Sequence, residues 1–169
     1  MDVFRFSERL MVMDDEAWAR HANPWSVWSR FSCAPLIVLA IWSRDWLGWW
    51  ALLPLALALF WTWLNPRLFA PPSRTDSWAS KGTFGERVFL NRDAMPIPGH
   101  HLRVARLLTF VSAFGLLPLI YGLIVLDVRT TVFGLVIAIG AKVWFVDRMV
   151  WLYEDMKDAS PDYAAWLKR

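Results

Sequence analysis

The sequence predicts an all-α protein, a four-transmembrane-helix bundle with a cytoplasmic or interfacial helical loop between helices 2 and 3. Hydrophobic residues make up 57% of the 169 residues, compared with about 45–50% in an average soluble domain. The long apolar stretches are continuous rather than alternating, which favours helices over the strands of a β-barrel. Ten of the 13 Trp residues gather near the ends of these stretches, where amphipathic rings favour the membrane interface.

Four stretches are apolar enough to cross a bilayer, for which about 20 residues are needed. They lie at 26–43, 46–64, 107–126 and 130–149. The first is the weakest because Arg30 interrupts it, and we expect this side chain to extend to the membrane interface.

These spans divide the chain into three parts. An N-terminal cytoplasmic or interfacial segment occupies 1–25, a four-helix membrane domain 26–151 and a cytoplasmic C-terminal tail 152–169, and a long loop at 66–106 lies within the membrane domain. Fifteen of the 18 Lys and Arg residues lie in the N-terminal part up to Arg30, in the long loop or at the C-terminal end from Arg148 onward. The positive-inside rule therefore predicts a multi-pass protein of the cytoplasmic (inner) membrane, with both termini and the long loop in the cytoplasm.

Small residues recur at helical spacing in the fourth span, at Gly134, Ala138 and Ala141. Small side chains let the backbones of neighbouring helices approach closely. We therefore expect this face of the fourth span to pack against the third.

Local signals place the ends of several helices. Asn23 followed by Pro24 predicts an N-cap before the first span, and the pair Asn65-Pro66 predicts the end of the second. In the long loop, residues 76–82 predict a short helix that ends at Gly82, and residues 83–91 predict a second short helix.

The sequence contains no common catalytic or nucleotide-binding motif, such as GxSxG, HExxH, a P-loop or GxGxxG. Its single cysteine, Cys33, excludes an intramolecular disulfide and any multi-cysteine zinc site. His100 and His101 are adjacent, and one regular helix face does not present two adjacent rings to one metal ion. We therefore expect neither a metal site nor a cofactor, and the net charge of +3 is too mild to indicate nucleic-acid binding.

Ionisable residues near the cytoplasmic end of the fourth span are the candidates for a polar site, because charges inside a span are costly. The candidates in and after the fourth span are Lys142, Asp147, Arg148 and Glu154. The candidates in the long loop, which we expect to lie opposite them, are Glu86, Arg87 and Arg92. We expect Asp147 to pair with Arg87 or Arg92, and Glu86 to be a partner for Arg148. The alternative is an ion-pair network that only fastens the loop to the bundle.

Several strings resemble those of one family. They are MDDEAWARHANPW (13–25), WTWLNPRLF (61–69), DSWASKGTFGERVFLNR (76–92) and DRMVWLYEDM (147–156). Together they resemble an uncharacterised prokaryotic family of small multi-spanning membrane proteins, defined as a domain of unknown function, over about residues 13–156. The resemblance implies a membrane protein and no activity.

The function predicted from these observations is that of a non-catalytic membrane protein that binds a lipid-like molecule or a membrane partner. The expected partners are membrane lipids, another membrane protein or a second copy of the chain. Two alternatives stay open: a membrane enzyme acting on a lipidic substrate at the cytoplasmic interface, and a small transporter.

Overall fold

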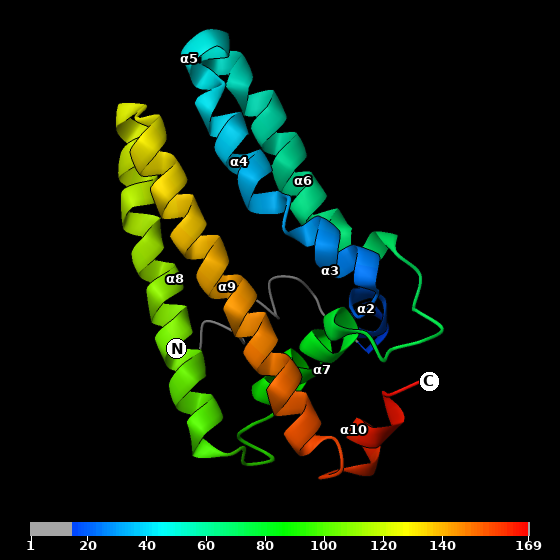
Figure 1. Ribbon diagram of the computed structural model, residues 1–169. Helices are drawn as coiled ribbons and strands as arrows, with labels where there is room; N and C mark the ends of the chain where they lie inside the picture. Colours follow the sequence, from blue (N-terminus) through cyan, green and yellow to red (C-terminus); the bar gives the residue numbers. More distant parts are fainter. Residues whose placement is uncertain (1–14, 169) are drawn as a thin grey trace.

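The computed structural model describes residues 15–168 and is helical throughout this part of the chain, with no strand. Figure 1 shows two helical pairs that extend in the same general direction from a base of shorter helices. The elements are α2 (Asp15–His21), α3 (Pro24–Arg30), α4 (Cys33–Trp42), α5 (Arg44–Leu47), η1 (Gly48–Ala51), α6 (Leu52–Leu68), α7 (Trp78–Leu90), α8 (Gly99–Val125), α9 (Val128–Met156) and α10 (Pro161–Ala165). Residues 1–14 of the expected N-terminal segment, and Arg169, lie outside the described residues.

Three segments of the described chain are long and apolar enough to cross a membrane: Pro24–Leu68, Gly99–Val125 and Val128–Met156. The first is folded back on itself, because α4 and α6 run side by side and α5 and η1 form the turn between them (Figure 1). At this turn Trp46, Trp49 and Trp50 are exposed. The first apolar segment is therefore a helical hairpin, preceded by α3.

Helices α8 and α9 form a tightly packed antiparallel pair (Figure 1). A Cβ atom added to Gly134 would lie 2.3 Å from the backbone nitrogen of Leu119, and one added to Gly115 would lie 2.8 Å from the nitrogen of Ala138. Ala141 is buried as well. The predicted packing of Gly134 and Ala138 against the third span is confirmed, since only small residues allow backbones this close.

Residues 76–91 of the long loop contain one helix, α7, in place of the two short helices predicted from the sequence. Ser77 caps it, since its side chain accepts a hydrogen bond from the Ser80 amide. Gly82 lies inside the helix, because it faces α9 rather than ending a turn. A Cβ atom there would lie 2.7 Å from Val146, and one at Gly85 would lie 1.8 Å from the carbonyl oxygen of Met149. The glycines permit close packing of α7 on α9.

Three helices extend beyond the expected spans. Helix α6 continues through Pro66 to Leu68, so Asn65-Pro66 does not end it. Asn65 is fully buried and donates a 2.6 Å hydrogen bond to Ser29 Oγ, which ties this turn of α6 to α3. Helix α8 begins at Gly99, inside the expected loop, and α9 continues to Met156, inside the expected tail.

The main core lies at the base, where α7, α9 and α10 meet the first turns of α8. Its fully buried members include Val88, Met149, Leu152 and Tyr153. A smaller cluster of Val38, Leu119 and Leu123 joins α4 to α8 farther along the pairs. This smaller cluster joins the two helical pairs directly.

Candidate functional site

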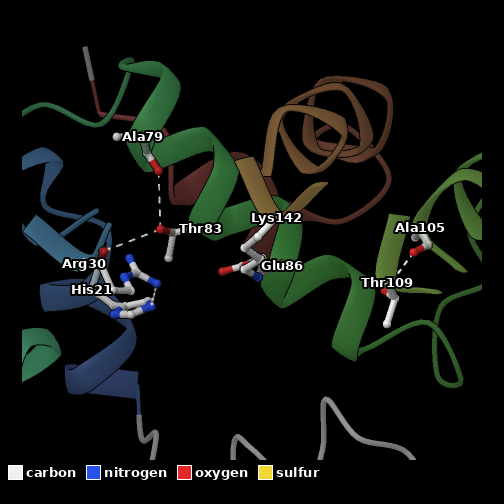
Figure 2. Close-up of polar contacts among 8 residues, drawn as sticks. All are labelled: His21, Arg30, Ala79, Thr83, Glu86, Ala105, Thr109 and Lys142. Carbon is white, nitrogen blue, oxygen red and sulfur yellow. Dashed lines mark hydrogen bonds and ion pairs between the residues drawn. The ribbon is translucent and has the colours of Figure 1, made fainter. Parts of the chain in front are cut away.

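Four ionisable side chains from four helices meet where the hairpin joins the base. His21 ends α2, Arg30 ends α3, Glu86 lies on α7 and Lys142 lies on α9 (Figure 2). The N-cap of Asn23, whose side chain accepts a hydrogen bond from the Trp25 amide at 2.9 Å, confirms the predicted start of α3. This cap turns the chain so that His21 and Arg30 come together.

Lys142 and Glu86 form the ion pair of this site, with 2.7 Å between Nζ and Oε1. The Glu86 side chain is only 17% exposed, whereas that of Lys142 is 50% exposed. The Lys142 ammonium also lies 4.6 Å from the ring centroid of Phe145. Lys142 therefore lies at the edge of the buried core, and its ammonium group is partly exposed.

Arg30 donates a hydrogen bond through a terminal guanidinium nitrogen to Nε2 of His21. Because arginine can only donate, His21 accepts through Nε2 and is neutral. Burial, and then the positive charges of Arg30 and Lys142, lower the pKa of His21 well below 6.5. Nε of Arg30 and Nδ1 of His21 are buried and have no hydrogen-bond partner among the described residues.

Glu86 supplies the negative charge of the cluster. Burial raises the pKa of its carboxyl group, but the charges of Lys142 and Arg30 outweigh this effect and hold the pKa below its ordinary value of 4.5. The carboxylate is therefore ionised at neutral pH. With Arg30 and Lys142 both charged and His21 neutral, the cluster keeps one positive charge in excess.

Two adjacent cavities open onto Arg30 and Lys142. The first, of about 150 Å³, is lined by Thr83 and Glu86 beside the two cations. The second, of about 240 Å³, extends between the two helical pairs along Leu116, Leu119, Leu135 and other apolar residues. The two cavities thus meet at Arg30 and Lys142, and apart from Thr83 and Glu86 in the first their lining is mainly apolar.

Thr83 connects this site to the first helices. Its hydroxyl lies 3.4 Å from the carbonyl oxygen of His21 and 3.3 Å from that of Ala79, as Figure 2 shows. Ser80, one turn earlier on α7, donates to the carbonyl oxygen of Ala22 at 2.7 Å. Helix α7 therefore fixes the position of His21 as well as that of Glu86.

The other predicted site residues lie in separate contacts around α7. Asp147 on α9 accepts a 3.1 Å hydrogen bond from the Trp78 indole and a 2.7 Å hydrogen bond from Arg148. Glu154 forms ion pairs with Lys81 at 2.5 Å and with Lys157 at 2.7 Å. The end of α9 and the loop helix are thus in direct polar contact.

The partners differ from those expected for three of the arginines. Arg87 pairs with Asp15 and lies 4.6 Å over the Trp166 ring, rather than pairing with Asp147. Arg92 donates to the carbonyl oxygen of Phe89 at 2.7 Å. Arg148 pairs with Asp147 and lies 5.3 Å from the Trp151 ring centroid, and Glu86 pairs with Lys142 instead of Arg148. The position of α7 along α9 determines which of these side chains meet.

The two adjacent histidines lie closer to one common partner than a regular helix face predicts. The rings of His100 and His101 lie with their centroids 4.1 Å apart, and Nε2 of both lies within 4.0 Å of one oxygen of Asp155. The pair lies in the first turn of α8, at the end of the helix rather than on a regular face. There, side chains lean past the helix end toward α9.

His21 and Arg30 were not among the predicted site residues. The signal for Arg30 was present, since it is the charge that interrupts the first apolar stretch, but it was interpreted only as extending to the interface. No local pattern marks His21, because its role depends on the position of α7.

The searches of curated proteins and of solved structures found no match. A family of unknown function, DUF6653, matches residues 5–168, a wider range than the resemblance over 13–156. That match covers nearly the whole sequence, including every residue of the site. The chain therefore belongs to this family of unknown function, DUF6653.

Proposed function

We propose that the protein crosses a membrane four times and binds an anionic amphiphile, a lipid-like molecule with a phosphate or carboxylate headgroup, between its two helical pairs. The observation that carries the proposal is that Arg30 and Lys142 line both cavities, the one that contains Thr83 and Glu86 and the mainly apolar one between the helical pairs. A headgroup and a hydrocarbon chain need these two environments side by side.

Four crossings follow from the hairpin. From Pro24 to Trp42 the chain rises about 28 Å, and α6 rises about 26 Å, at 1.5 Å per residue. These lengths approach the hydrocarbon thickness of about 30 Å. Both helical pairs also expose large apolar side chains, for example Leu57 on α6 and Phe133 on α9, for which lipid is the favourable solvent.

The orientation rests on charge. Arg44 and Arg129 are the basic residues at the ends of the pairs that lie away from the base. The base carries α7, the first turn of α8 and the C-terminal turns, where most of the other Lys and Arg residues lie. Under the positive-inside rule this base faces the cytoplasm.

The charges of the site favour an anion. Glu86 compensates one of the two cations, and the buried Nε of Arg30 retains an unused donor. A phosphate or carboxylate near this group gains a charge-assisted hydrogen bond, which is about twice as strong as a neutral one. The apolar cavity accepts a hydrocarbon chain without exposing it to water.

Native mass spectrometry of the detergent-purified protein, titrated with phosphatidylglycerol or phosphatidylcholine, tests the proposal. We expect preferential retention of phosphatidylglycerol, and a loss of at least about tenfold in its apparent affinity for Lys142→Gln and for Arg30→Gln. One buried charge-assisted contact is worth about 1.5–3 kcal/mol, which corresponds to such a factor.

Arg74→Gln is the matched control for Arg30→Gln, because Arg74 is an exposed arginine paired only with Asp76 in the described structure. It should retain phosphatidylglycerol as the wild type does. The proposal is wrong if the two lipids bind equally, or if folded Lys142→Gln and Arg30→Gln variants keep the wild-type preference.

A further inference from the structure

We propose that His100, His101 and Asp155 bind a divalent transition-metal ion, of the zinc class, at the base of the molecule. Each residue offers one ligand atom, and these three atoms all lie within 4.8 Å of one another. The cluster is formed by the first turn of α8 and the last turn of α9. It is separate from the amphiphile site and does not depend on it.

The distances fit one ion. Zinc binds histidine nitrogen and carboxylate oxygen at about 2.0–2.2 Å, so two ligand atoms of a tetrahedral site stand about 3.4 Å apart. Nε2 of His101 lies 2.8 Å from Oδ2 of Asp155, and Nε2 of His100 lies 4.0 Å from the same oxygen. A change of about 0.6 Å brings either histidine nitrogen to this spacing from the carboxylate oxygen, and the whole group of ligand atoms spans no more than 4.8 Å.

The hydrogen bond between His101 and Asp155 explains only part of this arrangement. His101 is buried, and one carboxylate partner satisfies its Nε2. His100 is 61% exposed, yet its Nε2 also lies near the same carboxylate oxygen. The hydrogen bond from His101 to Asp155 does not require a second imidazole near the same oxygen. Together the two imidazoles and the carboxylate form a set of metal ligands.

The ligand chemistry indicates the class of metal. Two imidazole nitrogens and one carboxylate suit zinc and its first-row neighbours, whereas calcium and magnesium prefer oxygen ligands alone. Three protein ligands leave a tetrahedral ion with one position for water, the arrangement found in catalytic zinc sites.

The electrostatic surroundings tolerate the added charge. The Asp155 carboxylate compensates one of the two positive charges of the ion. The C-terminal end of α9 favours a cation and the N-terminal end of α8 opposes it, so the two helix ends largely offset each other. Since His100 and Asp155 are exposed, an ion reaches the site directly from water.

Titration with Co²⁺ and with Zn²⁺ tests the proposal, on detergent-purified protein that carries no histidine tag. We expect one equivalent of Zn²⁺ by calorimetry, visible d–d absorption when Co²⁺ binds, and a higher Tm with either ion. His100→Ala should lower the affinity at least about tenfold while the Tm without metal stays unchanged, because the side chain is exposed.

Asp155→Asn gives a second variant, whose amide oxygen still accepts from His101. It too should lose most of the affinity. Asp158→Asn is its matched control, an exposed carboxylate on the same segment outside the three-residue group, and it should bind metal as the wild type does. The proposal is overturned if no ion binds saturably, or if folded His100→Ala and Asp155→Asn variants bind as tightly as the wild type.

Discussion

The α8–α9 interface and the interface between the two helical pairs differ in how closely their backbones approach. Between α8 and α9, glycines on both helices leave no room for a single added Cβ atom. Between α4 and α8 only a small apolar cluster makes contact, and a cavity of about 240 Å³ extends along the remaining surface. The tight interface provides a rigid support, and the loose one provides space in which a ligand fits.

The same contrast appears along α9. One part of this helix packs against α8 through Gly134 and Ala138, and a later part packs against α7 through Gly82 and Gly85 of that helix. Lys142 lies between these two parts, where small residues no longer close the surface. The polar site therefore lies where α9, which remains beside α8, begins to pack against α7 as well.

The largest effect is expected from Gly134→Ala. Its new Cβ atom would meet backbone atoms of Leu119 at 2.3–2.7 Å, and a backbone cannot move aside as a flexible side chain can. Overpacking a core typically costs about 1–3 kcal/mol, and more where the neighbouring atoms cannot move. We therefore expect the free energy of unfolding to fall by about 3 kcal/mol. Thermal unfolding in detergent, followed by size-exclusion chromatography, measures it.

Gly140→Ala is the control for that substitution on the same helix. Nothing lies within 4 Å of a Cβ atom at Gly140, and alanine is the better helix former by about 0.8–1.0 kcal/mol. It should leave the Tm unchanged or raise it. Equal losses for the two variants would mean that α8 and α9 are not closely packed.

Glu86→Gln should have the next largest effect, since it leaves Lys142 and Arg30 without their carboxylate. Lys142 is 50% exposed, so we expect about 1–2 kcal/mol, between the values for exposed and buried pairs. The double variant Glu86→Gln/Lys142→Met should recover part of this loss. A strictly additive double-mutant cycle by thermal unfolding would show that the two side chains do not interact.

Lowering the pH should decrease the free energy of unfolding through His21. The pKa of His21 is lowered well below 6.5 in the fold, by burial and then by Arg30 and Lys142. Below about pH 6.5 the unfolded chain therefore binds a proton that the folded chain excludes, and the free energy of unfolding decreases as the pH falls, by at most about 1.4 kcal/mol per pH unit. Above that pH His21 is neutral in both the folded and the unfolded chain, and it no longer makes the free energy of unfolding depend on pH.

His21→Gln isolates this effect, because its amide oxygen still accepts from Arg30 but does not titrate. Thermal unfolding measured at about pH 7.5 and pH 5.5 should show a smaller decrease for the variant than for the wild type. Identical decreases would mean that His21 is not kept neutral by the fold.

The smallest effect on stability is expected from Ala34→Leu. Ala34 is exposed and lines the apolar cavity between the helical pairs, so a larger side chain enters space that is already open. We expect a change within about 0.5 kcal/mol in thermal unfolding. Phosphatidylglycerol binding should weaken at the same time. A large loss of stability would show that this interface is as closely packed as the α8–α9 pair.

The sequence by itself predicted the helical fold class, the Asn23 cap and the small-residue face of α9. These features depend on composition and on periodicity within one helix, which a single chain displays directly. It also identified Lys142 and Glu86 as candidates, since charges near an apolar stretch are costly and need a partner. The pairing of these two residues could not be read from the sequence, because it depends on how α7 crosses α9.

Only the tertiary structure decided which residues meet. Gly82 was expected to end a helix, and instead it continues through α7 because α9 packs against it. His21 and Arg30 come together with Glu86 because α2, α3 and α7 converge there (Figure 2). Local signals depend on neighbours a few residues away, whereas the contacts of α7 with α9 and with the end of α2 join residues more than 50 positions apart. Their geometry is therefore determined by packing and not by any local pattern.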